Sequence, residues 1–310
     1  MSSQFRFLLT YEQYVANLLR SFPEDEAMAR AAGGNLERLG VLEHALLCNL
    51  GLGPGMSIVD VGCGSGRLAV ELACHQDLHY LGIDVVASLL QYARRRAGRE
   101  DFRFLHVDRV AVPVEDASAD FVVFFAVFPH LLPEESYTYL QEAMRVLKPG
   151  GRAVFSFLEY DMERAWRTFE GNLAWVKNRS VAGHLNIFLN RQDLRIWARK
   201  LGFRVEAMQP GDRPFITVAA EQATAVVPPG AYALGQSVCI LRKPAPEEAA
   251  EEEPDSAELR ERRRLEREAR RAARAQREGG AGGDRPQRRA RPADAMQAPG
   301  TEQPRRRRRA

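Results

Sequence analysis

Cysteine is scarce in this sequence, and the four that occur are scattered at Cys48, Cys63, Cys74 and Cys239. They form no CxxC pair, and no His/Cys cluster has the spacing of metal ligands. Neither a disulfide framework nor a zinc site is indicated, so the sequence predicts no metal. A chain of 310 residues with so few thiols fits a reducing compartment, and we expect a cytoplasmic protein.

Long apolar runs are lacking as well. The longest beyond the N-terminal region, residues 121–129, falls far short of the ~20 residues that a membrane-spanning helix needs. The short apolar run at residues 5–9 is broken by Arg6 and precedes no small-residue cleavage site. We therefore expect a soluble chain with neither a membrane span nor a secretion signal.

A dominant charge of one sign is missing from most of the chain. Residues 245–310 hold 18 of the 44 basic residues, all of them Arg, and 14 of the 41 acidic residues. The remainder is nearly neutral, which gives no domain-wide argument for a nucleic-acid substrate. With 45% hydrophobic residues the chain is long enough to bury a sizeable core.

Helical and extended patterns alternate after residue 50. Helical spacing of apolar residues in 1–50 predicts a helical lid region. Between residues 51 and 243, helical stretches separate short apolar runs, and such alternation predicts an α/β domain with a mainly parallel, doubly wound sheet. The seven strands are expected at residues 58–61, 80–83, 102–107, 121–125, 152–157, 203–207 and 236–241.

The composition changes abruptly after Lys243. Residues 244–310 contain Ala, Glu, Arg, Pro and Gly with almost no large apolar side chain. Such a segment cannot bury enough surface to offset the entropy of ordering it, so we expect a disordered, Arg-rich tail.

A glycine-rich loop follows the first predicted strand in residues 59–66, VDVGCGSG, and leads into a helix. Glycines let the backbone turn tightly and approach a ligand closely. A dinucleotide-binding loop needs the spacing G-x-G-x-x-G, whereas Arg67 or Ala69 occupies its third glycine position here. This spacing disfavours a nicotinamide-dependent oxidoreductase.

Asp60 together with the G-x-G-x-G spacing of Gly62, Gly64 and Gly66 resembles the first motif of class I S-adenosylmethionine-dependent methyltransferases. Further matches follow in order at residues 81–84 (LGID), 106–108 (HVD), 120–123 (DFVV) and 145–151 (RVLKPGG). The resemblance implies a Rossmann-like methyltransferase fold with a seven-stranded sheet and S-adenosylmethionine as the cofactor.

Particular residues are implied in the cofactor site. Asp84, at the end of the second strand, is expected to accept bonds from both ribose hydroxyls. Asp108 would receive the adenine amino group or cap a helix. Asp60 would face the amino group of the methionine moiety, order the glycine loop, or do both. The full predicted cofactor set is Asp60, Gly62, Gly64, Ser65, Gly66, Asp84, Val85 and Asp108.

His130 is the candidate base, because it follows the fourth strand, whose carboxyl end borders the substrate side of this fold. The alternatives are a role in capping the 133–147 region or in filling a polar niche. Glu159, Tyr160 and His184 are further candidates for contact with the acceptor.

Missing patterns narrow the acceptor. Base-amino methyltransferases typically carry an Asp/Asn-Pro-Pro-aromatic run after the fourth strand, where this chain has FAVFPH at residues 125–130, and no cysteine follows a proline as C5-cytosine methylation needs. A small-molecule, lipid or saccharide hydroxyl, or a small amine, is favoured. The alternative is an RNA- or ribosome-associated protein that uses the Arg-rich tail. The oligomeric state is left open.

Overall fold

The computed structural model describes residues 6–178 and 186–251. Its helices are α1 (Arg6–Ser21), α2 (Glu24–Ala31), α3 (Leu36–Asn49), α4 (Arg67–Leu72), α5 (Ala87–Ala97), α6 (Pro133–Val146), α7 (Glu163–Asn178), α8 (Arg191–Leu201) and α9 (Pro246–Glu251), with 3-10 turns η1 (Phe128–His130) and η2 (Ala220–Gln222). Its strands are β1 (Ser57–Val61), β2 (His79–Asp84), β3 (Arg103–His106), β4 (Ala119–Phe124), β5 (Leu147–Phe157), β6 (Arg204–Gln209), β7 (Ile216–Val218), β8 (Gly230–Tyr232) and β9 (Ser237–Arg242).

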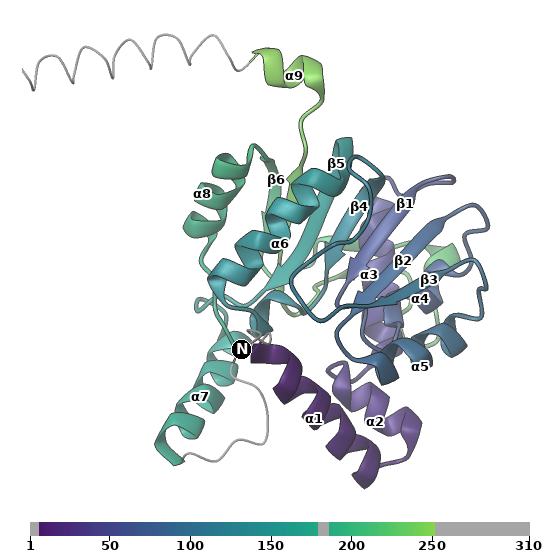
Figure 1. The fold of residues 1–310 in the computed structure, drawn as a ribbon, viewed down its shortest axis with the longest axis vertical. Coiled ribbons are helices and arrows are strands. Elements are labelled where there is room, and N and C mark those ends of the chain that lie inside the picture. The colour runs from purple at the N-terminus through teal and green to yellow at the C-terminus, as the bar shows by residue number, and fades with distance from the viewer. Residues whose placement is uncertain (1–5, 179–185, 252–310) are drawn as a thin grey trace, which may run out of the picture. The chain divides into compact units, whose positions relative to one another are not determined.

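Seven strands form one sheet in the order β3-β2-β1-β4-β5-β9-β6 (Figure 1). The five strands from β3 to β5 pair in parallel, whereas β9 runs antiparallel to both of its neighbours. The predicted seven-stranded, mainly parallel sheet is confirmed. From β1 the chain adds β2 and β3 on one side and then β4 and β5 on the other. The carboxyl ends of β1 and β4, where this direction reverses, therefore border the crevice where such sheets bind ligands.

The sheet is buried on both faces, as its near-continuous apolar strands require. Val59 and Val61 of β1 belong to one core cluster, and Ile58, which precedes Val59 and points to the opposite face of the sheet, belongs to the other. The first cluster includes side chains of α6 and α8, and the second includes side chains of α3 and α4. This arrangement is the doubly wound layering that the alternating sequence predicts.

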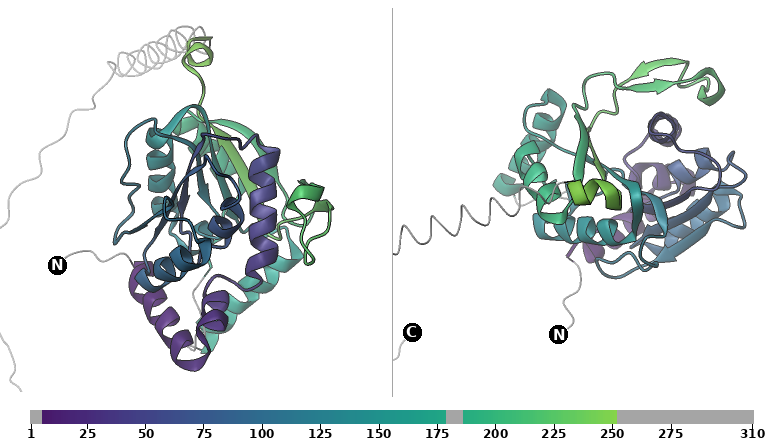
Figure 2. Two further views of the ribbon diagram at one scale, coloured as in Figure 1. Left: turned by 90° about the vertical axis from the view of Figure 1, so that its right-hand side faces the viewer. Right: turned by 90° about the horizontal axis from the view of Figure 1, so that it is seen from above.

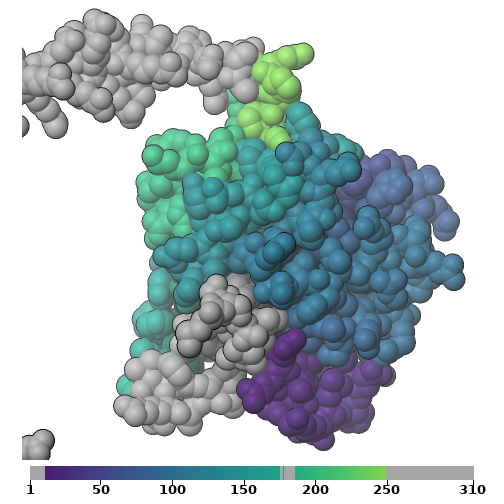
Figure 3. All heavy atoms as spheres, in the orientation of Figure 1, coloured from purple at the N-terminus to yellow at the C-terminus, as the bar shows by residue number. Residues whose placement is uncertain are grey.

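The helix α3 belongs to the body of the domain, although it falls within the region predicted as a lid. Val41, Leu42, Ala45 and Leu47 have no exposed surface, and the helix packs against α4 and β7. The predicted boundary at residue 50 therefore separates α3 from neighbours with which it shares a core. In the space-filling view the purple helices α1 and α2 lie at one end of the domain against its blue part (Figure 3).

A short hairpin of β7 and β8 is absent from the sequence prediction. It lies beside α3, as the view from above shows (Figure 2). Asn49, the last residue of α3, holds it there, because its side chain accepts a bond from the Thr217 backbone N–H at 2.8 Å and donates one to the Thr217 carbonyl at 3.0 Å. Strands of three residues are too short to give a period-2 signal.

Ordered structure continues past the predicted domain boundary at Lys243. The helix α9 lies beyond it, and the Glu248 carboxylate accepts bonds from both terminal nitrogens of Arg242, at 2.6 and 2.9 Å. Charge pairing rather than apolar burial holds this segment, which is why composition alone missed it. The remainder of the predicted tail, residues 252–310, lies outside the described residues, and its disorder stays a prediction.

Two features bear on the compartment. All four cysteines are free thiols, as the sequence predicts. Within the described part of the chain, no helix combines the length and apolar character needed to cross a bilayer. The cytoplasmic location stays a prediction.

Candidate cofactor and acceptor site

The glycine loop between β1 and α4 needs glycine at several positions. Gly62, Gly64 and Gly66 all have positive φ, at 72°, 55° and 79°. A Cβ on Gly62 would lie 2.4 Å from Val127 Cγ2, and a Cβ on Gly66 would lie 2.7 Å from Ala93 Cβ. Backbone conformation disfavours larger residues at all three positions, and close packing adds to this at Gly62 and Gly66.

Asp84 ties this loop to the turn that follows β2. Its Oδ2 accepts the Gly64 backbone N–H at 2.8 Å, and its Oδ1 accepts the Val86 N–H at 2.9 Å. The side chain is only 5% exposed, and burial raises its pKa. Since each carboxylate oxygen has about two acceptor positions, one bond to each leaves capacity for the two ribose hydroxyls. Val85, next in the turn, is buried, and its carbonyl pairs with His106 Nε2 at 2.9 Å.

Asp60 lies in β1, two residues before Gly62, and is buried, with 3% of its surface exposed. The Tyr80 hydroxyl donates to Asp60 Oδ2 at 2.8 Å. Burial raises the pKa of Asp60 to about 7, although the Tyr80 bond opposes the rise. The sequence analysis did not foresee this tyrosine partner, which β2 places beside β1 by parallel pairing. The predicted contact with the methionine amino group stays a prediction.

The loop fits a bound cofactor in two respects. The Ser65 hydroxyl is buried and makes no hydrogen bond to any described residue. A buried hydroxyl normally has a partner, so this one is suited to a ligand. At Gly64 the space beside the backbone is open, because a Cβ there would have Ala32 Cβ, at 3.9 Å, as its nearest neighbour.

Asp108 is exposed in a bend directly after β3. No helix is described between β3 and β4, so the alternative that Asp108 caps a helix is wrong. Its position at the carboxyl end of β3 places it at the same edge of the sheet as Asp84. The adenine contact stays a prediction.

A buried ion pair, which sequence reasoning missed, joins the helices next to the glycine loop. Arg67, at the start of α4, places its Nη2 2.6 Å from Glu43 Oε1 and donates from Nη1 to the Ala32 carbonyl at 2.9 Å. Burial raises the pKa of Glu43, while Arg67 lowers it. The available signal was Glu43 itself, a charged residue within the apolar face of α3. The pair joins α2, α3 and α4 around the glycine loop.

His130 is the last residue of η1, which follows β4. Its backbone N–H donates to the Val127 carbonyl at 2.9 Å. At the start of α6 the Glu135 side chain accepts the Leu132 N–H, and a capping role for His130 stays a prediction. The neighbouring Pro129 carbonyl accepts the Ile187 N–H at 2.7 Å, which brings the 186–190 segment alongside.

Glu159 has a structural role instead of the expected acceptor contact. It is buried and accepts two bonds from Arg191, at 2.7 and 2.8 Å, and one from the Ser237 hydroxyl. Burial favours a higher pKa, but the bonds from Arg191 and Ser237 hold it below the ordinary value. It thereby joins β5, α8 and β9. The other candidate, His184, lies outside the described residues.

Tyr160 belongs to an aromatic cluster that the sequence analysis did not foresee. Its ring stacks on Phe188 with centroids 4.6 Å apart and meets Phe169 edge-on at 5.3 Å, and Trp166 lies 5.1 Å from Phe169. Tyr160 and Trp166 are 49% and 42% exposed. The cluster is formed by α7 and its flanking segments, and α7 extends from the same end of the sheet as α1 (Figure 1).

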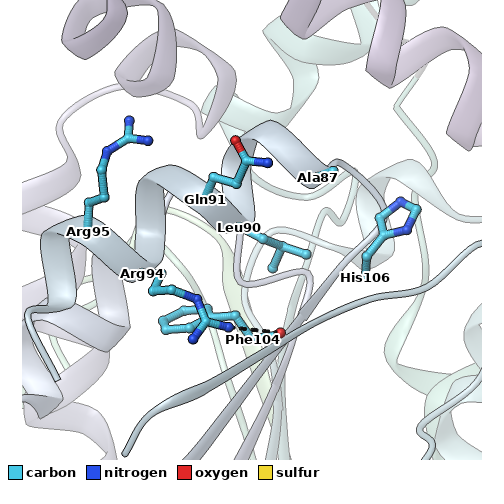
Figure 4. Close-up of a pocket in the computed structure, with 7 residues that line it drawn as sticks. All are labelled: Ala87, Leu90, Gln91, Arg94, Arg95, Phe104 and His106. Carbon is cyan, nitrogen blue, oxygen red and sulfur yellow. Dashed lines mark hydrogen bonds between the residues drawn. The ribbon is translucent and has the colours of Figure 1, made fainter. Parts of the chain in front are cut away.

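A surface pocket of about 440 Å³ lies between α5 and β3. Figure 4 shows its lining residues Ala87, Leu90, Gln91, Arg94, Arg95, Phe104 and His106. Arg94 crosses its floor, where it donates to the Phe104 carbonyl at 3.5 Å. The pocket borders the β2–α5 turn, and its lining includes neither Asp84 nor the glycine loop.

Residues 59–155 match the family model described as "Methyltransferase domain". The 27-O-demethylrifamycin SV methyltransferase of Amycolatopsis mediterranei is 32% identical over 149 residues, which cover 44% of this chain and 54% of that protein. The tRNA (carboxymethyluridine(34)-5-O)-methyltransferase of Mus musculus is 36% identical over 101 residues, 32% of this chain and 14% of that protein. This chain thus matches about half or less of these relatives' length.

Among solved structures, magnesium protoporphyrin IX methyltransferase from Synechocystis PCC 6803, with bound SAH, superposes with a TM-score of 0.52. The alignment covers 76% of this chain and 99% of that chain at 15% sequence identity. The likeness is one of fold.

Proposed function

We propose that this chain binds S-adenosylmethionine and transfers its methyl group to a hydroxyl or amine of a small molecule, since residues 59–155 match the methyltransferase-domain model. The observation that carries the proposal is the glycine loop joined to Asp84, with the buried Ser65 hydroxyl beside it. S-adenosylmethionine supplies an activated methyl group, which an acceptor oxygen or nitrogen takes by in-line displacement of the sulfur.

The chain's own task is therefore positioning and desolvation. Asp84 holds the ribose, Asp60 faces the methionine amino group, and Val85 with Asp108 borders the adenine. His130 takes the proton that a hydroxyl acceptor loses as its oxygen bonds to the methyl carbon. Its position after β4 supports this role, since catalytic groups of such sheets gather at the carboxyl ends of the strands.

An acceptor with a flat, apolar part is favoured by the aromatic cluster of Tyr160, Trp166, Phe169 and Phe188. Exposed aromatic rings offer large contact area with little loss of side-chain entropy. The rifamycin relative supports a small-molecule acceptor by its name. In this proposal α1, α2 and the described part of residues 161–190 form the walls of the acceptor pocket.

An RNA acceptor is the second candidate. One relative modifies a tRNA, and the run Arg305–Arg309 would neutralise several phosphates. The tail has no interleaved aromatic residues for base stacking, and its acidic residues offset most of its charge. These features place RNA behind a small molecule.

Binding and transfer should be tested together. Calorimetry should detect binding of S-adenosylmethionine and its demethylated product to the wild type, and Asp84→Ala should weaken it by roughly 1–3 kcal/mol as hydrogen bonds are lost. Labelled cofactor should then be incubated with metabolite, lipid and RNA fractions from the source cell. Label in a metabolite or lipid supports the first proposal, and label in RNA alone favours the second. No binding to well-folded protein would refute both.

A further inference from the structure

A cluster of potential metal ligands lies outside the cofactor site. His44 lies on α3, while Cys74 and His75 come just after α4. The two imidazole Nε2 atoms are 2.7 Å apart, and the ligand atoms of all three side chains lie within 4.8 Å of one another. His44 is 6% exposed, His75 is half-buried and Cys74 is exposed, so the cluster is closed on one side and open on the other.

These distances are close to those of a tetrahedral zinc site. With Zn–N bonds of 2.0–2.1 Å, two ligand nitrogens lie ~3.3 Å apart, so the imidazoles need to separate by only ~0.6 Å. The two rings already meet edge-on at 81°, with their Nε2 atoms directed at each other. A single ion between them would take the place of one hydrogen bond.

The donor set suits zinc chemically. Two imidazole nitrogens and one thiolate form a borderline-soft set, which zinc prefers over the oxygen ligands of magnesium or calcium. Neutral imidazole is the form of histidine that binds metals. The Cys74 thiol now donates to the Glu71 carbonyl at 3.2 Å and would deprotonate on binding.

We propose that His44, Cys74 and His75 form a zinc site that joins α3 to the end of α4. Zinc takes three protein ligands there, and a water molecule on the open side completes the tetrahedron. The site clamps the two helices that carry Glu43 and Arg67, the ion pair beside the glycine loop. The proposal stands independently of the methyl acceptor.

Metal titration of the untagged, full-length, chelator-treated protein tests the site. Cobalt(II) should bind at one equivalent, with sulfur-to-cobalt charge-transfer absorption in the near ultraviolet, and zinc should displace it. Zinc should also raise the melting temperature, because an ion that binds only the folded state stabilises it. Absence of the charge-transfer band at one equivalent of cobalt would overturn the proposal.

Variants at the open side of the cluster keep the test independent of folding. Cys74→Ser should abolish the charge-transfer band, and both Cys74→Ser and His75→Ala should weaken zinc binding at least tenfold. The control is His79→Ala, which removes an exposed histidine of β2 outside the cluster. Wild-type affinity in both ligand variants, or an equal loss in His79→Ala, would show that zinc binds elsewhere and refute the site.

Discussion

At the scale of single residues, the two buried carboxylates of the proposed cofactor site differ in their partners. Asp84 accepts two backbone N–H groups, whereas Asp60 accepts the Tyr80 hydroxyl. The fold fixes the direction of the backbone N–H groups, which can only donate, whereas the Tyr80 hydroxyl can rotate and accept a hydrogen bond. Asp60 therefore tolerates protonation, which matters for pH dependence near neutrality.

The free energy of unfolding of the ligand-free protein should depend on pH through the ionisation of Asp60. Its folded-state pKa of about 7 lies above its ordinary value of 3.8, so the folded state holds this proton more tightly than the unfolded state. That stabilisation is complete below pH ~4 and is lost as the pH rises to about 7. Denaturant unfolding across this range should show the loss in wild type but not in Asp60→Asn.

Two further measurements sharpen the test of Asp60. Tyr80→Phe removes the hydrogen bond that lowers the pKa, so it should move the loss of stability to higher pH. S-adenosylmethionine has a cationic amino group, and its binding should tighten as Asp60 ionises over the same range. Identical pH profiles of unfolding for wild type and Asp60→Asn would show that Asp60 does not titrate there.

His130→Ala is expected to affect turnover and not cofactor binding. Once an acceptor is identified, the variant should lower kcat roughly 10²–10⁴-fold, which is the usual contribution of a general base. Affinity for S-adenosylmethionine should stay at the wild-type value, measured by calorimetry. The comparison variant is His79→Ala, at an exposed position of β2. An unchanged rate at all pH values would leave His130 with a structural role alone.

At the scale of elements, the approach of α4 to α5 is set by Gly66. A Cβ there would lie 2.7 Å from Ala93 Cβ and 2.9 Å from Ala93 Cα, and the latter is a backbone atom that cannot rotate away. The glycine caps α4, so pushing α5 back would also move the loop that precedes α4. The packing of α4 on α5 and the geometry of the glycine loop thus both depend on the absence of a side chain at Gly66.

Gly66→Ala should destabilise the fold by about 2–5 kcal/mol, since overpacking adds to the cost of a left-handed conformation. Gly98→Ala is the matched control, because Gly98 also has positive φ, at 61°, but a Cβ there meets nothing within 4 Å. The control should lose only about 1–2 kcal/mol, the conformational cost alone. Equal losses in chemical unfolding would show that the Ala93 contact relaxes freely.

At the scale of the whole molecule, the boundary of the folded domain lies beyond Lys243. Glu248 pairs with Arg242 and also contacts Arg204, and its carboxylate accepts the Ala245 N–H at 3.0 Å. The bonds from Arg242 lower the pKa of Glu248 to about 2. The side chains of these ion pairs are partly exposed, so salt should weaken the pairs.

Two truncations separate the folded segment from the predicted tail. A chain ending at Glu251 should keep the melting temperature and cofactor affinity of the full chain, because residues 252–310 have few apolar side chains. A chain ending at Lys243 should melt slightly lower at low salt, and Glu248→Gln in the full chain should reproduce part of that drop. Salt-sensitive binding to RNA should be lost in both truncations. A large drop in melting temperature at Glu251 would show that the tail packs on the domain.

The sequence by itself determined the sheet and the loop, because both are local or periodic signals. Apolar runs alternating with helical stretches predicted all seven strands of the main sheet, and the spacing of Gly62, Gly64 and Gly66 predicted the tight loop after β1, where all three have positive φ. Such patterns can be read from the sequence, because strand burial and positive φ each depend on residues only a few positions apart.

Only the tertiary structure decided which side chains far apart in the sequence meet. Packing of α3 on α4 joins Glu43 to Arg67 and brings His44 to Cys74 and His75, although no spacing indicated either cluster. Likewise, β9 inserted between β5 and β6 places Ser237 against Glu159 and turns a predicted acceptor contact into a buried structural bond. Side-chain partners depend on how elements dock, and a single sequence without that docking does not specify them.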